Sequence, residues 1–327
     1  MDESTRDPRR CGSPHDAWVV LAMIGAVVLP AALTLLRVDQ PRDVVDPSTN
    51  PTPFGYTWSL LLYLVPVLAL AGWLARHPEH RLQRSALRLS LLILVPLGFG
   101  LDLLLGTRFF DFRNEGATLG IGVPALGGSI PIEELVFYAM GFLVVLLLYM
   151  WADEYWMGAY NLPDYGVESK RVARLLGFDA RSLWVGVALV GAAAAYKKLL
   201  AADPEGFPWY FAFLVGAAVV PSVGFYRAIE RFINWRAFSV TFFLMLLVSL
   251  LWEATLGVPY QWWNYNPRMM MGLFVDGWTN LPLEAVFVWL VVSYTSVIVY
   301  ETVKVYRASG RSLKQALWGA QLPPVPR

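Results

Sequence analysis

Five carboxylates lie within or at the ends of strongly apolar segments: Asp102, Glu133, Glu134, Glu253 and Glu284. Placing an ionisable side chain at membrane depth costs roughly 2.5–3.5 kcal/mol of insertion free energy. Each of these acids is therefore a candidate functional residue. Two neighbouring carboxylates oppose each other's ionisation, so one member of the Glu133–Glu134 pair is expected to keep a proton. A carboxyl group that holds a proton is what a general acid needs. The acids therefore predict acid–base chemistry.

Aromatic residues accompany these acids along the sequence. Phe137 and Tyr138 follow the glutamate pair at helical spacing. Further aromatic residues lie in the loop before each glutamate helix: Phe109, Phe110 and Phe112 in the first half, and Tyr260, Trp262, Trp263 and Tyr265 in the second. Their π faces stabilise a carbocation, and Asn264 and Asn266 beside them are suited to orienting a carboxyl group by hydrogen bonding.

Each of these features also has a purely structural interpretation. Glutamates in the first turn of a helix often only cap it and interact with its dipole. Interfacial Trp and Tyr commonly form membrane belts. Asp102 and Glu253 have Arg108 and Arg268 as possible ion-pair partners. These alternatives stay open at the level of sequence.

A repeat with a constant offset of 151 residues favours the functional interpretation. The offset aligns Asp102 with Glu253, Gly106 with Gly257, Pro131 with Pro282 and Glu133 with Glu284. The second copy departs from the first, because Ala285 aligns with Glu134 and Val288 with Phe137. The repeat predicts two similarly oriented units related by a pseudo-two-fold axis along the membrane normal, with a site between them.

The composition is that of a membrane protein. Of the 327 residues, 57% are hydrophobic and only 16% are charged, with a net charge of +1, so no nucleic-acid partner is expected. The single cysteine, Cys11, excludes an intrachain disulfide. No glycine-rich dinucleotide motif, Walker loop, metal-binding cluster or pair of aspartate-rich motifs is evident. We therefore expect no cofactor and no metal, and a prenyltransferase is disfavoured.

Eight apolar segments approach the roughly 20 residues needed to cross a bilayer. They cover residues 17–36, 56–75, 87–105, 131–151, 182–201, 208–227, 237–257 and 281–301. They predict an all-α integral membrane protein of about eight transmembrane helices, built as two tandem four-helix repeats. The first repeat covers 1–151, a cytoplasmic linker covers 152–181, and the second repeat covers 182–327.

Lys and Arg residues set the expected orientation. They concentrate in the N-terminus, in the loops after the second, fourth and sixth segments, and in the C-terminus. By the positive-inside rule, both termini of this multi-pass protein of the cell membrane are then cytoplasmic. Glu133 and Glu134 are expected to enter their segment from the extracytoplasmic side.

The glutamate-pair motif resembles that of a known enzyme family. Pro131, Glu133, Glu134, Phe137 and Tyr138, after the Gly/Leu-rich approach at 119–122, resemble the motif of the membrane-integral lycopene cyclases of the heterodimeric or fused type. In that family two small helical units form one enzyme, which agrees with the repeat. The resemblance covers both halves and is specific in the first.

The resemblance implies an isomerase that closes the ψ end groups of lycopene to ionone rings without net redox change. A carboxylic acid, with Glu133 favoured, protonates an end-group double bond. After ring closure, Glu134 or Glu284 removes a proton, while Phe137, Tyr138 and the Trp262–Trp263 pair shield the cation. The implied partners are membrane lipids and a lipophilic carotenoid taken from the bilayer, and assembly with other carotenoid enzymes is left open.

Two alternatives remain beside this prediction. One is a related end-group enzyme that acts on C50 carotenoids or adds water to the end group. The other is a non-catalytic membrane transporter or scaffold that uses the acids as a ligand or proton pathway.

Overall fold

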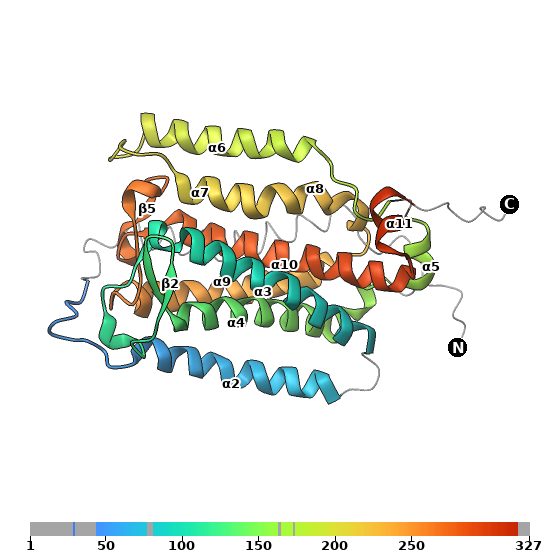
Figure 1. The fold of residues 1–327 in the computed structure, drawn as a ribbon, viewed down its shortest axis with the longest axis horizontal. Helices are drawn as coiled ribbons and strands as arrows, with labels where there is room; N and C mark the ends of the chain where they lie inside the picture. The colour runs from blue at the N-terminus through green and yellow to red at the C-terminus, as the bar shows by residue number, and fades with distance from the viewer. Residues whose placement is uncertain (1–28, 30–43, 77–80, 163–164, 173, 320–327) are drawn as a thin grey trace.

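The computed structural model describes residues 29, 44–76, 81–162, 165–172 and 174–319. Long helices run side by side along the longest axis of the molecule (Figure 1). The helices are α2 (Gly55–Arg76), α3 (Arg81–Phe109), α4 (Ile132–Trp151), α5 (Tyr165–Lys170), α6 (Arg181–Leu199), α7 (Trp209–Leu214), α8 (Val220–Ile229), α9 (Trp235–Trp252), α10 (Leu283–Ser309) and α11 (Leu313–Trp318). The prediction of a mostly helical protein is confirmed.

Six stretches of helix in the described part are long and apolar enough to cross a membrane. They are Gly55–Arg76, Gln83–Phe109, Ile132–Trp156, Trp209–Ile229, Trp235–Gly257 and Leu283–Ser309. They coincide with six of the eight predicted segments. The predicted segment 17–36 lies outside the described residues. The segment 182–201 forms α6, which is not among the six and carries three basic residues, Arg181, Lys197 and Lys198.

Turns of π-helix extend or interrupt three of these spans. They are η6 (Ala152–Trp156) after α4, η8 (Val215–Val219) between α7 and α8, and η9 (Glu253–Gly257) after α9. Such turns are rare and occur frequently at functional sites. One of them begins at the candidate acid Glu253.

Short strands gather at one end of the bundle. They are β1 (Phe110–Asp111), β2 (Gly122–Ala125), β3 (Gly128–Pro131), β4 (Asn264–Tyr265), β5 (Phe274–Val275) and β6 (Leu281–Pro282). The hairpin β2–β3 leads into α4, and β5–β6 leads into α10. The antiparallel pair β1–β4 joins the two aromatic loops, with Phe110 opposite Tyr265. The hydropathy pattern predicts only helices, and these strands come from the loops between them.

The largest core cluster lies between α4, α9 and α10, with contributions from α3, α5 and α8. The outer helices α2 and α6 instead expose large apolar side chains, including Trp58, Leu62, Trp184 and Val187. Apolar side chains on the outside of the bundle are typical of a protein whose solvent is lipid. The apolar residues of the sequence therefore occupy two environments: a packed core at the centre of the bundle and an exposed outer surface.

Candidate functional site

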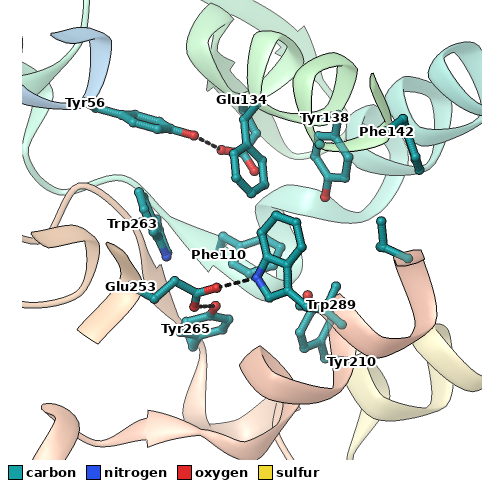
Figure 2. A pocket seen from close by; sticks show the side chains of 14 residues that line it. Tyr56, Phe110, Glu134, Tyr138, Phe142, Tyr210, Glu253, Trp263, Tyr265 and Trp289 are labelled. Atoms are coloured by element: carbon teal, nitrogen blue, oxygen red, sulfur yellow. Dashed lines mark hydrogen bonds between the residues drawn. The ribbon is translucent and has the colours of Figure 1, made fainter. Parts of the chain in front are cut away.

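An aromatic cavity at the strand-bearing end of the bundle contains two of the predicted acids. We call this cavity the chamber. Its walls come from α2, α4, α7, α10, η9 and the β1–β4 region; the lining residues are Tyr56, Phe110, Glu134, Phe137, Tyr138, Gly141, Phe142, Tyr210, Glu253, Trp263, Tyr265, Val288, Trp289 and Val292. Figure 2 shows Glu134 and Glu253 on opposite sides of it. Among the described residues no Lys, Arg or His lines the chamber, and the two acids face it without a basic partner from that part of the chain.

Glu134 reaches the chamber from the first turn of α4. Pro131 caps that helix in an extended conformation, and both Glu133 and Glu134 lie in its first turn, as the sequence predicts. The Tyr56 hydroxyl donates to Glu134 Oε2 at 2.8 Å. The other Glu134 oxygen receives no hydrogen bond from the described part of the chain, although the residue is only 8% exposed. This leaves one carboxyl oxygen free to carry a proton toward the cavity.

Glu253 is held from both sides. Its Oε2 accepts from the Tyr265 hydroxyl at 2.5 Å, and its Oε1 accepts from the Trp289 indole at 3.0 Å. Burial, and then the nearby Glu253, raises the pKa of the Tyr265 phenol well above its usual range. Tyr265 therefore stays a donor at physiological pH, and together with the Trp289 indole it fixes the position of the Glu253 carboxyl group.

Glu133 and Glu284 are buried but do not line the chamber. Glu133 Oε1 accepts from the backbone N–H of Leu119 at 2.7 Å and from Thr57 Oγ1 at 2.6 Å. Glu284 Oε1 accepts from the backbone N–H of Met271 at 2.5 Å. The two aligned glutamates thus do the same thing, which is to fix the loop that precedes their own helix. Charge-assisted bonds to backbone N–H groups are strong and suit a positioning role.

Asp102 lies beside the chamber rather than in it. It is 4% exposed and lines an apolar groove next to the chamber. A Cβ on Gly106 would lie 2.4 Å from Asp102 Oδ1, and a Cβ on Gly257 would lie 2.1 Å from a Trp263 ring atom. Both glycines of the repeat are therefore required by close packing of the side chains around the site.

Asp102 and Glu253 do not form the ion pairs that their neighbouring arginines suggest. Among the described residues no ion pair joins Asp102 to Arg108 or Glu253 to Arg268. Arg268 instead lies 3.9 Å from Glu205 at the surface.

Most of the predicted aromatic residues lie in or beside the chamber. Phe110, Phe137, Tyr138, Trp263 and Tyr265 line it, and Phe109 packs in a separate cluster with Tyr210. Phe112 and Trp262 pack in a neighbouring cluster with Tyr56, and the Trp262 indole donates to Thr52.

The two asparagines do not contact a predicted acid by a hydrogen bond in the described part of the chain. The Asn264 side-chain nitrogen is buried without a partner there. Asn266 binds the backbone of Arg108 and Arg268 and so fixes the loop.

Six lining residues are not predicted from the sequence: the aromatic residues Tyr56, Phe142, Tyr210 and Trp289, and the small or aliphatic residues Gly141 and Val292. Trp289 aligns with Tyr138 under the 151-residue offset, so the repeat contains a signal for it. Tyr56, Phe142 and Tyr210 have no local signal, because aromatic residues are common at helix ends and in spans.

The chain matches no protein-family model, no curated protein and no solved structure. The groups of His, Cys, Asp and Glu in the described residues include none able to hold a metal ion.

Proposed function

We propose that the protein is a membrane-integral lycopene cyclase, or a close carotenoid end-group enzyme, that works by acid–base catalysis in the chamber. The observation that carries the proposal is the pair Glu134 and Glu253, which face one aromatic cavity without a basic side chain. A carbocation needs such a place, because aromatic faces and a carboxylate stabilise positive charge while apolar walls limit water.

We assign the role of the protonating acid to Glu134 instead of Glu133. Glu134 lines the chamber, whereas Glu133 does not. Both hydrogen bonds of Glu133 go to Oε1 and hold Leu119 and Thr57, and its Oε2, which has no partner in the described chain, is buried outside the chamber lining. Glu134 protonates a double bond of the end group, and the neighbouring alkene attacks the cation to close a six-membered ring. Glu253 takes up the proton that the ring loses. The substrate is isomerised, and one proton enters and one leaves.

Aromatic side chains have distinct parts in this scheme. Phe137 lies edge-on to Trp289 with ring centroids 5.6 Å apart, and both line the chamber. Trp289 also orients Glu253 through its indole nitrogen. Their faces shield the cation, and Tyr56 and Tyr265 hold the two carboxyl groups in place.

We also propose the finer architecture of two tandem repeats with both termini in the cytoplasm. Supporting it, a hairpin precedes both α4 and α10, and in both cases the glutamate two residues after the proline binds the loop upstream. An added cysteine at Leu126, in a Cys11→Ser background, is expected to react with an impermeant maleimide in intact cells. A cysteine at Ser312 is expected to react only after lysis.

The test of function is expression in a bacterium that accumulates lycopene, followed by pigment separation. Monocyclic or bicyclic carotene is expected with the wild-type chain, and unchanged lycopene is expected with Glu134→Gln. A hydroxylated acyclic product would instead identify an enzyme that adds water. Unchanged lycopene with wild-type protein in the membrane would contradict the proposal and favour the transporter or scaffold alternative.

A further inference from the structure

Two apolar grooves adjoin the chamber on different sides. The first, which we call the α3 groove, lies between α3, α7–η8 and α10; the second, the α2 groove, lies between α2, α4 and α9. Their empty volumes, counting the open mouths, are about 720 and 1000 Å³. In the described part of the chain, no Lys, Arg or His lines either groove, and nearly all of the lining residues are apolar. Both are therefore suited to hydrocarbon, and the question is which one is continuous with the reacting acids.

The α3 groove shares much of its wall with the chamber. Six residues line both: Phe110, Tyr138, Phe142, Tyr210, Val288 and Val292. The groove follows α3 from Leu94 to Phe109, which is roughly 22 Å at the rise of an α-helix. That length is most of the ~30 Å hydrocarbon thickness of a bilayer. A linear apolar chain with its end in the chamber fits this shape.

The α2 groove is separated from the chamber by aromatic rings. Only Phe137, Gly141 and Trp289 line both spaces, and the Phe137 and Trp289 rings pack against each other there. The Trp289 indole is further fixed by its bond to Glu253. A chain lying in the α2 groove would have to displace this pair before its end reached the acids.

Small residues keep the α3 groove open. Ala217 and Ala218 line it from the π-turn η8, and Gly98 lines it from α3. A Cβ on Gly98 would lie 2.8 Å from the Phe142 ring, so Gly98 lets the groove wall approach the chamber closely.

We propose that the α3 groove binds the linear polyene chain of the substrate and so determines the chain length that the enzyme accepts. Among the described residues that line this groove, Asp102 is the one acid, and the wall shared with the chamber is aromatic and aliphatic. The inference rests on the proposed function for the identity of the chain as a polyene. Measuring substrate binding apart from turnover tests the groove assignment independently of the proposed reaction.

The test measures lycopene binding in detergent micelles by quenching of tryptophan fluorescence, with Ala218→Phe in the α3 groove and Val248→Phe in the α2 groove as the matched control. Filling the α3 groove is expected to weaken lycopene binding roughly tenfold, which corresponds to about 1.4 kcal/mol. Filling the α2 groove is expected to leave it unchanged. Ala217→Leu is a milder filling if Ala218→Phe does not yield folded protein.

A second measurement uses chain length. Ala218→Phe is expected to lower turnover of lycopene while leaving turnover of a short isoprenoid hydrocarbon with the same end group unchanged.

The outcomes distinguish the two proposals. Lycopene affinity lost in Val248→Phe but kept in Ala218→Phe would overturn the groove assignment, as would equal loss of long and short substrates. Affinity unchanged in both variants would overturn it as well and would favour a lipid acyl chain as the occupant. Binding that depends on Ala218, with no conversion by the wild-type chain, would overturn the proposed reaction alone.

Discussion

Two groups of buried acids lie at opposite ends of the bundle, and they differ in what surrounds them. At the strand-bearing end, Glu134 and Glu253 face a cavity, and their hydrogen-bond donors among the described residues, Tyr56, Tyr265 and Trp289, are all neutral. At the other end, near α5, Asp153 and Glu301 lie around the buried Lys304, whose Nζ is 3.2 Å from Asp153 and 3.4 Å from Glu301.

The second group is closed by further hydrogen bonds. Tyr149 and Tyr165 each donate to Glu301 at 3.0 Å, and Asn234 donates to Asp153 at 2.9 Å. None of these residues lines the chamber or either groove. Burial, and then Glu301, raises the pKa of Tyr165 well above its ordinary value, so its hydroxyl remains a donor.

The contrast separates acids that are bound into an ion network from acids that face a cavity. A buried ion network with its bonds satisfied fixes one arrangement of the elements; here it joins α4, α10 and the linker helix α5. Carboxyl groups beside an apolar cavity, with no cation to neutralise them, are suited to exchanging protons. Burial of a carboxylate alone therefore does not identify a catalytic residue. What distinguishes Glu134 and Glu253 is a cavity beside the carboxyl group and no basic partner among the described residues.

The largest expected effect of any single change is on turnover, at the chamber. Glu134→Gln keeps the shape and one acceptor for Tyr56 but removes the proton, so turnover is expected to fall by roughly 10²–10⁴-fold. The measurement is the rate of carotene formation per folded protein, with the thermal unfolding midpoint as a check on folding. Glu133→Gln, next to it in sequence, is the control and is expected to keep a much larger share of activity. The reverse order would return the acid role to Glu133.

A change in the other group is expected to act on stability instead. Lys304→Met leaves Asp153 and Glu301 buried without their cation, which typically costs about 3–5 kcal/mol. Denaturant or thermal unfolding in detergent measures this loss. Arg307→Met, one turn further along α10 and exposed, is the control and is expected to change little. Equal stability of the two variants would show that the network is not structural.

Substitution of the aligned glutamates Glu133 and Glu284 is expected to have a smaller effect on stability, similar in the two halves. Glu133→Gln and Glu284→Gln each weaken a charge-assisted bond to a backbone N–H, so each is expected to lower the unfolding free energy by about 1.5–3 kcal/mol. Similar losses from the two variants would support equivalent roles in the two halves. Abolished turnover in a stable Glu284→Gln variant would contradict a positioning role.

The smallest expected effect is on alkaline stability. The raised pKa of Tyr165 and Tyr265 means that the folded state holds these protons more tightly than the unfolded chain. Their contribution is fully present below about pH 10, the unfolded pKa, and is lost as pH rises toward the higher folded value. The loss is at most about 1.4 kcal/mol per pH unit for each tyrosine. Tyr165→Phe and Tyr265→Phe should each make unfolding less dependent on pH above 10, and an unchanged slope would refute this.

Much of the helical architecture could be predicted from the sequence. Apolar runs of spanning length must form helices in lipid, since every backbone polar group there needs an internal partner, and six such helices appear where predicted. Pro131 and Pro282 mark the starts of α4 and α10 because proline lacks the N–H that a helix interior requires. The offset of 151 residues aligns Asp102 with Glu253, so the sequence also predicts both as candidate site residues.

The roles of the acids depend on the tertiary structure. Adjacent residues on a helix point about 100° apart, so the rotation of α4 against α2 and α9 determines that Glu134, and not Glu133, faces the chamber. Glu253 likewise receives its donors from other elements, Tyr265 of β4 at 12 residues and Trp289 of α10 at 36 residues along the chain. Composition and spacing determined that acids and aromatic residues would lie at one end of a membrane bundle. Only packing between distant helices decided which acids meet a cavity, because side-chain direction is fixed by contacts that no local pattern records.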